Sequence, residues 1–568
     1  MARGKRRKGG GVDLRRLCLR LDALREQRER FVPAWREISR YITPGRGKFD
    51  EAEPNRGDRR DEALLDPTPY YALNTLAAGM QGGLTSRSRP WFRLGVSDPD
   101  LADDARVRRW LDEVERRMTQ VMGQSNLYNS LHTLYAEVGA FGTGAMLIEE
   151  DPVTVIRCTT MTAGAYSLGF GPDDRPDAFG RTFWMSAGQM ADEFGYDVLS
   201  EGARNALDGN RPGTWFEVNQ LIWRARGDAD PAPFGEEMPV ASAYWESAGA
   251  DGTPLRVAGY REFPVVAPRW DVLGGDTYGR GPGWYALGES KTLQELRHDY
   301  LVAQKLAIRP PMQAPTAAKA ARADLRPGAV TYATGDVGYR PLFQVRPDIP
   351  GQMQAIADSR GIVRQMFYVD LFLMLASNDT RGMTAREVAE RHEEKLQMLG
   401  PVLERMDTEL LDPLIGRVFV VMDRFGLVPP PPEELEGRRL EVEYISMLAQ
   451  AQLAAGIGGV DQLTAFVANV AGADPSVLDK IDLDEAVDQY GRMLGTPASI
   501  VRSGDEVAEM RQRRAEEQAM MQQMAAMQQA AQTAESGARA AKDLSGVPLE
   551  GGGNVLEALA GAAGGDAM

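Results

Sequence analysis

The stretch from residue 289 to residue 426 constrains the fold of this 568-residue chain most strongly. Apolar residues spaced three and four apart predict one helix over Glu289–Ile308 and another over Thr384–Gly426, and a helical segment over Pro350–Phe367 lies between them. The sequence Arg309-Pro310-Pro311 ends the first helix, because proline has no backbone N–H and clashes with the preceding turn. Since the stretch shows no pattern typical of catalysis, we interpret it as a device that holds long helices side by side.

Composition restricts the kind of protein further. A hydrophobic content of 43% and a charged content of 26% are typical of a globular protein with two to four domains' worth of core. No apolar run approaches the roughly 20 residues of a membrane helix, so we expect no membrane partner. A net charge of −16 argues against a protein that grips DNA tightly, because phosphate neutralisation dominates such binding, but it allows DNA to slide past.

The rest of the chain divides by pattern. Alternating polar and apolar residues predict antiparallel strands over 153–270, with a helix over Ala187–Phe194. We expect the fold class to be α+β and mainly α, with a basic flexible arm over 1–13 and a mixed domain over 14–288. Further along we expect a proline- and charge-rich boundary over 427–440, a helical region with glycine breaks over 442–500, a long exposed helix over 505–541 and a flexible tail over 542–568.

Four groups of residues, spread in order along the chain, resemble one protein family, the head-to-tail connector (portal) proteins of short-tailed bacteriophages. These four groups are Asn74–Ser86 with Arg89–Phe92, Ser125–Tyr128 with Gly139–Ala145, Arg269-Trp270 with Tyr278–Pro282, and Met383–Val388 with Gly400–Leu403.

The resemblance implies a ring of twelve copies at one capsid vertex, a virion location, and assembly in the host cytoplasm. Double-stranded DNA would pass through the ring. The implied partners are the terminase large subunit, tail adaptor proteins, the major capsid protein and scaffolding protein, with no cofactor and no enzymatic activity. The implied parts are a wing (14–288), stem helix 1 (289–308), a clip (309–346), stem helix 2 (347–369), a channel loop (370–383), a helix returning to the wing (384–426), a crown (427–504) and a C-terminal helical barrel (505–541).

Two segments carry the candidate contact residues. The polar tip of the expected loop can line a wet channel or be an ordinary solvated turn; its residues are Asn378, Asp379, Thr380 and Arg381. The expected clip is the one sizeable basic segment in the body of the chain, with six basic residues against Asp324 and Asp336. Those six residues are Arg309, Lys319, Arg322, Arg326, Arg340 and Arg346. They suit an acidic partner surface, the channel mouth, or salt bridges between ring neighbours.

Two other motifs have structural interpretations. Thr384 and Glu387 have the spacing of a capping box, which would fix the start of the third helix and so the direction of the loop; contact with DNA is the alternative. The glycines of Gly139–Gly144 superficially suggest a phosphate-binding loop. A probable helix before them and an apolar strand after them favour tight backbone turns instead.

Other functions are less consistent with the sequence. The three histidines, His132, His298 and His392, have no neighbouring ligands at metal-site spacing, and no nucleophile–base pair is visible. A hydrolase with a β-rich domain would require one of these. A non-channel scaffold or adaptor protein of the virion is the second alternative.

Overall fold

The computed structural model divides the chain into two compact units, residues 1–456 and 457–568. It describes residues 13–49, 64–98, 101, 104–225, 238–249, 253–310, 312–313, 340–341, 347–376, 399–435, 440–445, 466–467, 469–470, 480, 484, 504–545, 548–549 and 553–554.

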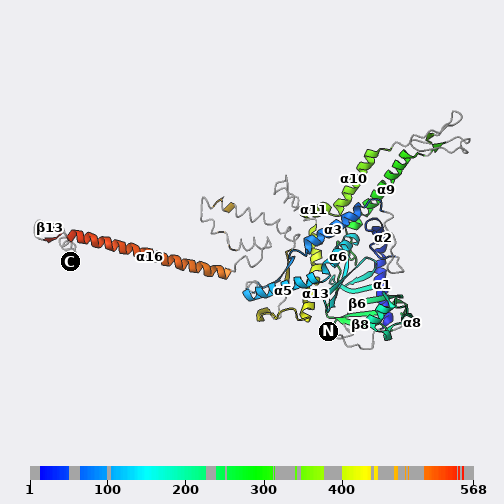
Figure 1. Cartoon of the computed structure of the whole chain (residues 1–568), viewed down its shortest axis with the longest axis horizontal. Helices are drawn as coiled ribbons and strands as arrows, with labels where there is room; N and C mark the ends of the chain where they lie inside the picture. The colour runs from blue at the N-terminus through cyan, green and yellow to red at the C-terminus, as the bar shows by residue number, and fades with distance from the viewer. Residues whose placement is uncertain are drawn as a thin grey trace. The chain divides into compact units, whose positions relative to one another are not determined.

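The larger unit is mixed α and β, in agreement with the fold class expected from the sequence (Figure 1). Its described helices of eight or more residues are α1 (Leu14–Glu29), α2 (Val32–Tyr41), α3 (Thr68–Leu84), α5 (Ala105–Gln124), α6 (Leu127–Phe141), α7 (Ala187–Phe194), α8 (Glu201–Asp208), α9 (Pro282–Ile308), α10 (Ile349–Met366), α11 (Val369–Ala376) and α13 (Asp412–Arg424). The helix expected over Ala187–Phe194 is present with those bounds, whereas α8 was not predicted.

Antiparallel sheets follow α6, as the alternation over 153–270 predicts. A three-stranded sheet has the order β3-β2-β9, from β2 (Ala145–Asp151), β3 (Val155–Met161) and β9 (Val265–Val266). A five-stranded sheet runs in chain order from β4 to β8, through β4 (Tyr166–Phe170), β5 (Pro176–Ser186), β6 (Trp215–Arg224), β7 (Val240–Glu246) and β8 (Arg256–Tyr260).

Helix α1 covers part of the five-stranded sheet with its leucines. Leu14, Leu17, Leu21 and Leu24 recur at helical spacing and are buried against a cluster that includes Leu221 and Trp245. Gly180 of β5 makes room for this contact, because a Cβ there would lie 2.3 Å from the side chain of Leu21.

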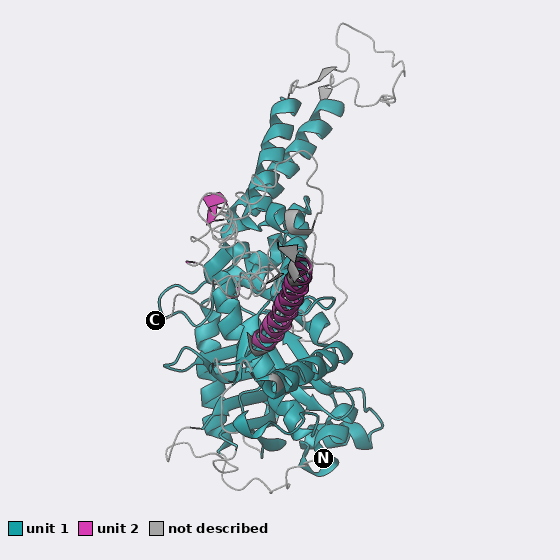
Figure 2. Ribbon diagram, turned by 90° about the vertical axis from the view of Figure 1, so that its left-hand side faces the viewer, with its two compact units in different colours: residues 1–456 teal, residues 457–568 magenta. Residues whose placement is uncertain are grey.

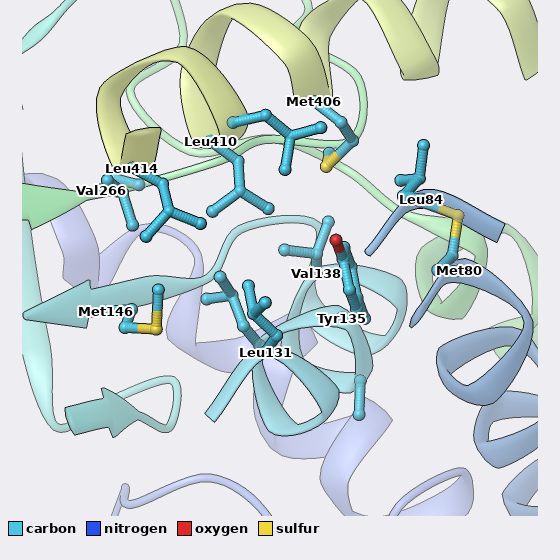
Figure 3. Close-up of a cluster of buried hydrophobic side chains, with 14 of the residues drawn as sticks. Met80, Leu84, Leu131, Tyr135, Val138, Met146, Val266, Met406, Leu410 and Leu414 are labelled. Atoms are coloured by element: carbon cyan, nitrogen blue, oxygen red, sulfur yellow. The ribbon is translucent and has the colours of Figure 1, made fainter. Parts of the chain in front are cut away.

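Helix α6 lies at the centre of the main core. Figure 3 shows Leu131, Tyr135 and Val138 of α6 facing Met406 and Leu410 of the helical segment 399–424. The Tyr135 hydroxyl is buried and lies 3.1 Å from the Thr85 hydroxyl just after α3, which satisfies its polar group inside this apolar cluster.

Helices α9 and α10 form a side-by-side pair that projects from the rest of the larger unit (Figures 1 and 2). The helix expected over Glu289–Ile308 is part of α9, which begins earlier because Pro282 occupies its first turn. The second expected helix corresponds to α10, which starts at Ile349 behind Asp348; the Asp348 carboxylate accepts from the N–H of Gly351, 3.1 Å away.

The chain turns sharply between α10 and α11. Tyr368, at the corner, has a φ of +54°, a left-handed conformation that is uncommon for a bulky residue. Its ring lies 6.1 Å from that of Trp270. The expectation of a loop over Asp370–Met383 is wrong for its first part, because α11 continues to Ala376. Its apolar residues explain the error: Leu371 and Phe372 are buried, and Phe372 packs where Gly79 of α3 has no side chain.

The third expected helix is described over 399–424, and its start at Thr384 lies outside the described residues. Within it, Asp407–Leu411 form a π-helical turn that leads into α13. The prediction of helix after residue 442 is wrong at its beginning, because β12 (Leu440–Tyr444) pairs with β1 (Phe92–Val96). Pairing with a strand distant in sequence is not visible in local spacing.

The smaller unit contains one long helix, α16 (Gly504–Ser545), which extends beyond both ends of the helix expected over 505–541. Its side chains from Arg511 to Ala540 are exposed, including Met520, Met524 and Met527.

A cluster of glycines joins α6 to the start of α9. Gly142 caps α6 with a φ of +85°, and a Cβ there would lie 2.3 Å from the Gly279 carbonyl oxygen. A Cβ on Gly283 would lie 2.2 Å from the Ala140 carbonyl oxygen. The main chains therefore approach more closely than any side chain would allow, and the interpretation of Gly139–Gly144 as a tight turn between helix and strand is confirmed.

We predict that Gly283→Ala lowers the thermal unfolding temperature of the protein, with a loss of roughly 1–3 kcal/mol, because the new methyl group forces the backbones apart. Gly288→Ala is the matched control, since a Cβ at this exposed position of the same helix meets no atom within 4 Å. It should gain about 0.5–1 kcal/mol from helix propensity. Equal effects of the two substitutions in thermal unfolding would contradict the close-approach argument.

Candidate functional site

The candidate site is the α9–α10 pair together with the groups that hold its base. Of the six predicted clip residues, Arg309 ends α9, and Arg340 pairs with Gln313 in a short antiparallel ladder of β10 (Met312–Gln313) and β11 (Arg340–Pro341). The other clip residues, Lys319, Arg322, Arg326 and Arg346, lie outside the described residues, as do the loop residues Asn378–Arg381 and the capping pair Thr384 and Glu387.

A buried amide anchors α9 to the segment before α3. The Gln294 side chain accepts hydrogen bonds from the backbone N–H groups of Leu65 and Asp66, at 2.7 and 2.8 Å, and donates to the Asp66 carbonyl at 3.0 Å. Gln294 is 5% exposed, so these bonds satisfy groups that would otherwise be buried without partners. Gln294 was not selected from the sequence; its place next to Leu293, in the apolar stripe, is the local signal that it is buried.

A salt bridge anchors α10 to the same segment. Arg360 donates from Nε and Nη2 to Oδ2 of Asp66, at 2.9 and 2.7 Å. Burial by itself would raise the pKa of Asp66, but hydrogen bonds from Thr68 and Arg360 outweigh it and hold that pKa below its usual value. Because Gln294 and Arg360 meet at one segment, the two helices share a base.

Further contacts join the two helices in the same region. The Ser359 hydroxyl of α10 donates to Glu289 of α9 at 2.6 Å, and Leu293, Ile356 and Val363 are buried nearby. Towards the free end, large apolar side chains are exposed, with Ile308 at 76% and Met353 at 56%.

The charges on the first helix of the pair are balanced. Along α9, Lys291, Arg297 and Lys305 offset three carboxylates, those of Glu289, Glu295 and Asp299. A helix with this balance carries no strong net field of either sign.

A second polar group links the sheets to the helix that carries the π turn. Arg269, 1% exposed, donates from Nε and Nη2 to Glu409 of the π turn at 3.1 and 2.8 Å, and from Nη2 to Asp174 at 2.9 Å. Its guanidinium also lies over the Phe170 ring, 4.0 Å from the ring centre. The bidentate pairing fixes the geometry of the π turn relative to the β4–β5 hairpin.

Acidic and phenolic groups gather beside the π turn. Burial, with Asp412 and Glu404 nearby, raises the pKa of Asp407 to about 7. The hydroxyl of Tyr444 in β12 donates to Asp412, and the negative charge of Asp407 also acts on the buried Tyr135 of α6. Asp407 therefore exchanges its proton near neutral pH.

The aromatic residues near this region belong to the core. Trp91 and Trp270 are buried, and Trp284 donates to the Phe141 carbonyl at 2.9 Å, so they are not stacking platforms for bases. Within the described part of the chain, no three His, Cys, Asp or Glu side chains are grouped as ligands for a metal ion. No described helix combines the length and the hydropathy needed to cross a membrane.

Comparisons with known proteins agree with the motif resemblance. Residues 15–501 match the family described as the bacteriophage head to tail connecting protein. The chain is 40% identical over 530 residues to the portal protein of Salmonella phage epsilon15, covering 92% of this chain and 94% of that one. It is 41% identical over 522 residues to the probable portal protein of Bordetella phage BPP-1, covering 91% and 94%.

The chain therefore belongs to the head-to-tail connecting, or portal, protein family of bacteriophages. The family is structural rather than enzymatic, and its members are parts of the phage particle. Among solved structures, a chain from the neck of an empty gene transfer agent particle matches with a TM-score of 0.38 and 13% identity, covering 78% of this chain and 96% of that chain.

The raised pKa of Asp407 predicts a pH-dependent stability. The folded state binds this proton more tightly than the unfolded state, whose carboxyl titrates near 3.8, so the wild type should lose stability as pH rises from about 4 to above 7. Asp407→Asn removes this loss, and its advantage in unfolding temperature should grow between pH 5 and pH 8. Glu404→Gln removes one neighbouring charge and should weaken the pH dependence. A difference in unfolding temperature that does not change with pH would refute this assignment.

Proposed function

We propose that twelve copies of this chain form a ring at one capsid vertex, through which double-stranded DNA passes during packaging and ejection. The observation that carries this proposal is the α9–α10 pair: two long helices that are held together, are anchored to the core through Gln294, Asp66 and Arg360, and project from the rest of the larger unit. Repeated about an axis, such a pair can form the wall of a channel. Contacts between neighbours in a ring are heterologous and must close.

The balanced charges of α9 suit passage rather than capture. Tight DNA binding requires the neutralisation of many phosphates by Lys and Arg, whereas this chain is acidic overall and α9 carries equal numbers of each sign. The work of translocation would then come from an ATPase on another chain, and this protein would supply the channel and a docking surface.

We assign a role to each remaining segment from its place along the chain. In this proposal, the segment 309–346 between α9 and α10 is the clip, where the terminase large subunit docks during assembly in the host cytoplasm and tail adaptor proteins dock later. The channel loop would follow α11, with Asn378–Arg381 at its tip and Thr384 and Glu387 capping the next helix. The outer surface of residues 14–288 would contact the major capsid protein and scaffolding protein.

Helix α16 would form the helical barrel by packing against its copies. Its exposed Met520, Met524 and Met527 continue into Ala531, Ala534, Ala538 and Ala541, all at alternating spacings of four and three residues. That spacing is typical of a seam between parallel helices, and its residues from Met520 to Ala538 are exposed in a single copy. The seam supports association of identical helices, since it has no other described partner within its unit.

Negative-stain electron microscopy of the purified full-length chain tests the ring. We expect closed rings with a central hole at micromolar concentrations. Monomers at every concentration would overturn the proposal, and spirals or sheets would favour a scaffold or adaptor role. ATP or nuclease turnover lost on changing one carboxylate would favour the hydrolase alternative.

A second experiment tests the channel loop separately from the ring. Replacing Asn378–Arg381 by a glycine–serine segment of equal length should leave ring formation intact, because α11 ends before this segment, while reducing the DNA retained in packaged particles. Arg381→Gln alone should give a smaller effect in the same assay, since it removes only the phosphate-binding charge. If the replacement abolishes rings, the segment is structural.

A further inference from the structure

The two-stranded ribbon of β1 and β12 has two outer edges, and no described strand pairs with the outer edge of β12. Ile445 donates to the Trp91 carbonyl at 3.1 Å, which makes this pair a hydrogen-bonded one in the antiparallel register. Hydrogen-bonded pairs alternate along such a ribbon, so Glu443 and Glu441 also point their main-chain groups at β1. The N–H and C=O groups of Leu440, Val442 and Tyr444 therefore point away from it.

The outer edge of β1 is different, because it is already occupied. The main-chain N–H of Leu94 points outward in this register, and it donates to the carboxylate of Glu115 on α5, which packs against β1. Open strand edges attract further strands, and proteins normally cover or interrupt them. Here β1 has such a cover, and β12 has none among the described residues.

An apolar groove of about 840 Å³ borders β12 on the side that faces α13. Its apolar lining includes Leu94, Leu440 and Val442 from the ribbon, Trp110 of α5, and Phe419 and Val420 of α13. On α13 the groove exposes Asp412, Gly416, Val420 and Asp423, which recur at helical spacing on one face. The middle of this face is small and apolar, and both ends are acidic.

The charges around the groove favour an occupant with basic residues. Asp412, Asp423 and Glu441 line it, and its described lining contains no Lys or Arg. The two aspartates are eleven residues apart on α13, or about 16 Å along the axis. A strand of seven residues spans about 20 Å, so basic residues near its two ends can reach both carboxylates while apolar residues between them cover Gly416 and Val420.

We infer that the open edge of β12 and the adjoining groove bind an extended segment of a partner protein, with alternate apolar side chains flanked by basic residues. The segment would pair with the outward groups of Leu440, Val442 and Tyr444 as a third strand, which supplies affinity, while the α13 face selects the side chains. This inference does not depend on the ring, since the site lies within one copy of the larger unit.

Fluorescence polarisation with a labelled peptide tests the site on the full-length protein. The probe is Arg-Thr-Val-Thr-Val-Thr-Arg, and the control peptide Arg-Val-Thr-Thr-Thr-Val-Arg has the same composition with its valines on the opposite face. We expect saturable binding of the probe, and binding at least about tenfold weaker for the control, since one strand face enters the groove.

Matched substitutions locate the binding. Gly416→Arg should abolish it by filling the groove with like charge, and should not unfold the protein, because a Cβ at Gly416 meets no atom within 4 Å. Gly361→Arg, at an equally open position of α10, should leave binding unchanged. Val442→Pro should also weaken binding, since it removes an outward N–H without removing a bond to β1.

Three results of the peptide experiments would overturn the inference. They are no saturable binding, equal binding of both peptides, and binding that Gly416→Arg leaves unchanged. Concentration-dependent self-association that only Gly416→Arg removes would also overturn it, because the occupant would then be a second copy of this chain.

Discussion

The direct approach of main chain to main chain where α6 ends and α9 begins supports the rest of the structure. Gly142, Gly279 and Gly283 lie so close to facing carbonyl oxygens that no side chain fits between. The carbonyl of Phe141 also accepts from the indoles of Trp35 and Trp284, so α2 and α9 are fixed at the same point of α6. Helix α6 is buried in the close-packed main core. The direction of α9 is therefore set by its contacts with α6.

Buried polar contacts add directional restraints to this apolar packing. Hydrophobic contacts are non-directional, whereas a hydrogen bond or a bidentate salt bridge requires a particular position of both partners. Gln294 and Arg360 both bind the segment at Asp66, and Arg269 binds Glu409 with two bonds. Each of these contacts loses a buried partner if its helix moves, so together they fix the base of the pair and the π turn.

Local pattern was enough to predict the long helices α9, α10 and α16 and much of the mixed domain, but not the short helices α8 and α11. The stripes of α9 and the proline stop after Ile308 are local signals, and α9, α10 and α16 are where they indicate. The strand β12 was missed because it is defined by pairing with β1, more than three hundred residues earlier in the chain. The loop prediction failed at α11 because Phe372 is buried against Gly79, a tertiary contact that periodicity does not contain. The Arg269 motif was recognised by resemblance, but its role depends on Glu409, which no spacing rule connects to it.

The backbone corner at Tyr368, between α10 and α11, depends on the side chains around it. A left-handed conformation in a bulky residue costs roughly 1–2 kcal/mol, and the neighbouring side chains must hold it in place. The ring of Trp270 lies against that corner, and Trp270 directly follows the arginine that binds the π turn. The contact between Trp270 and Tyr368 therefore couples the backbone corner between α10 and α11 to the segment that carries Arg269.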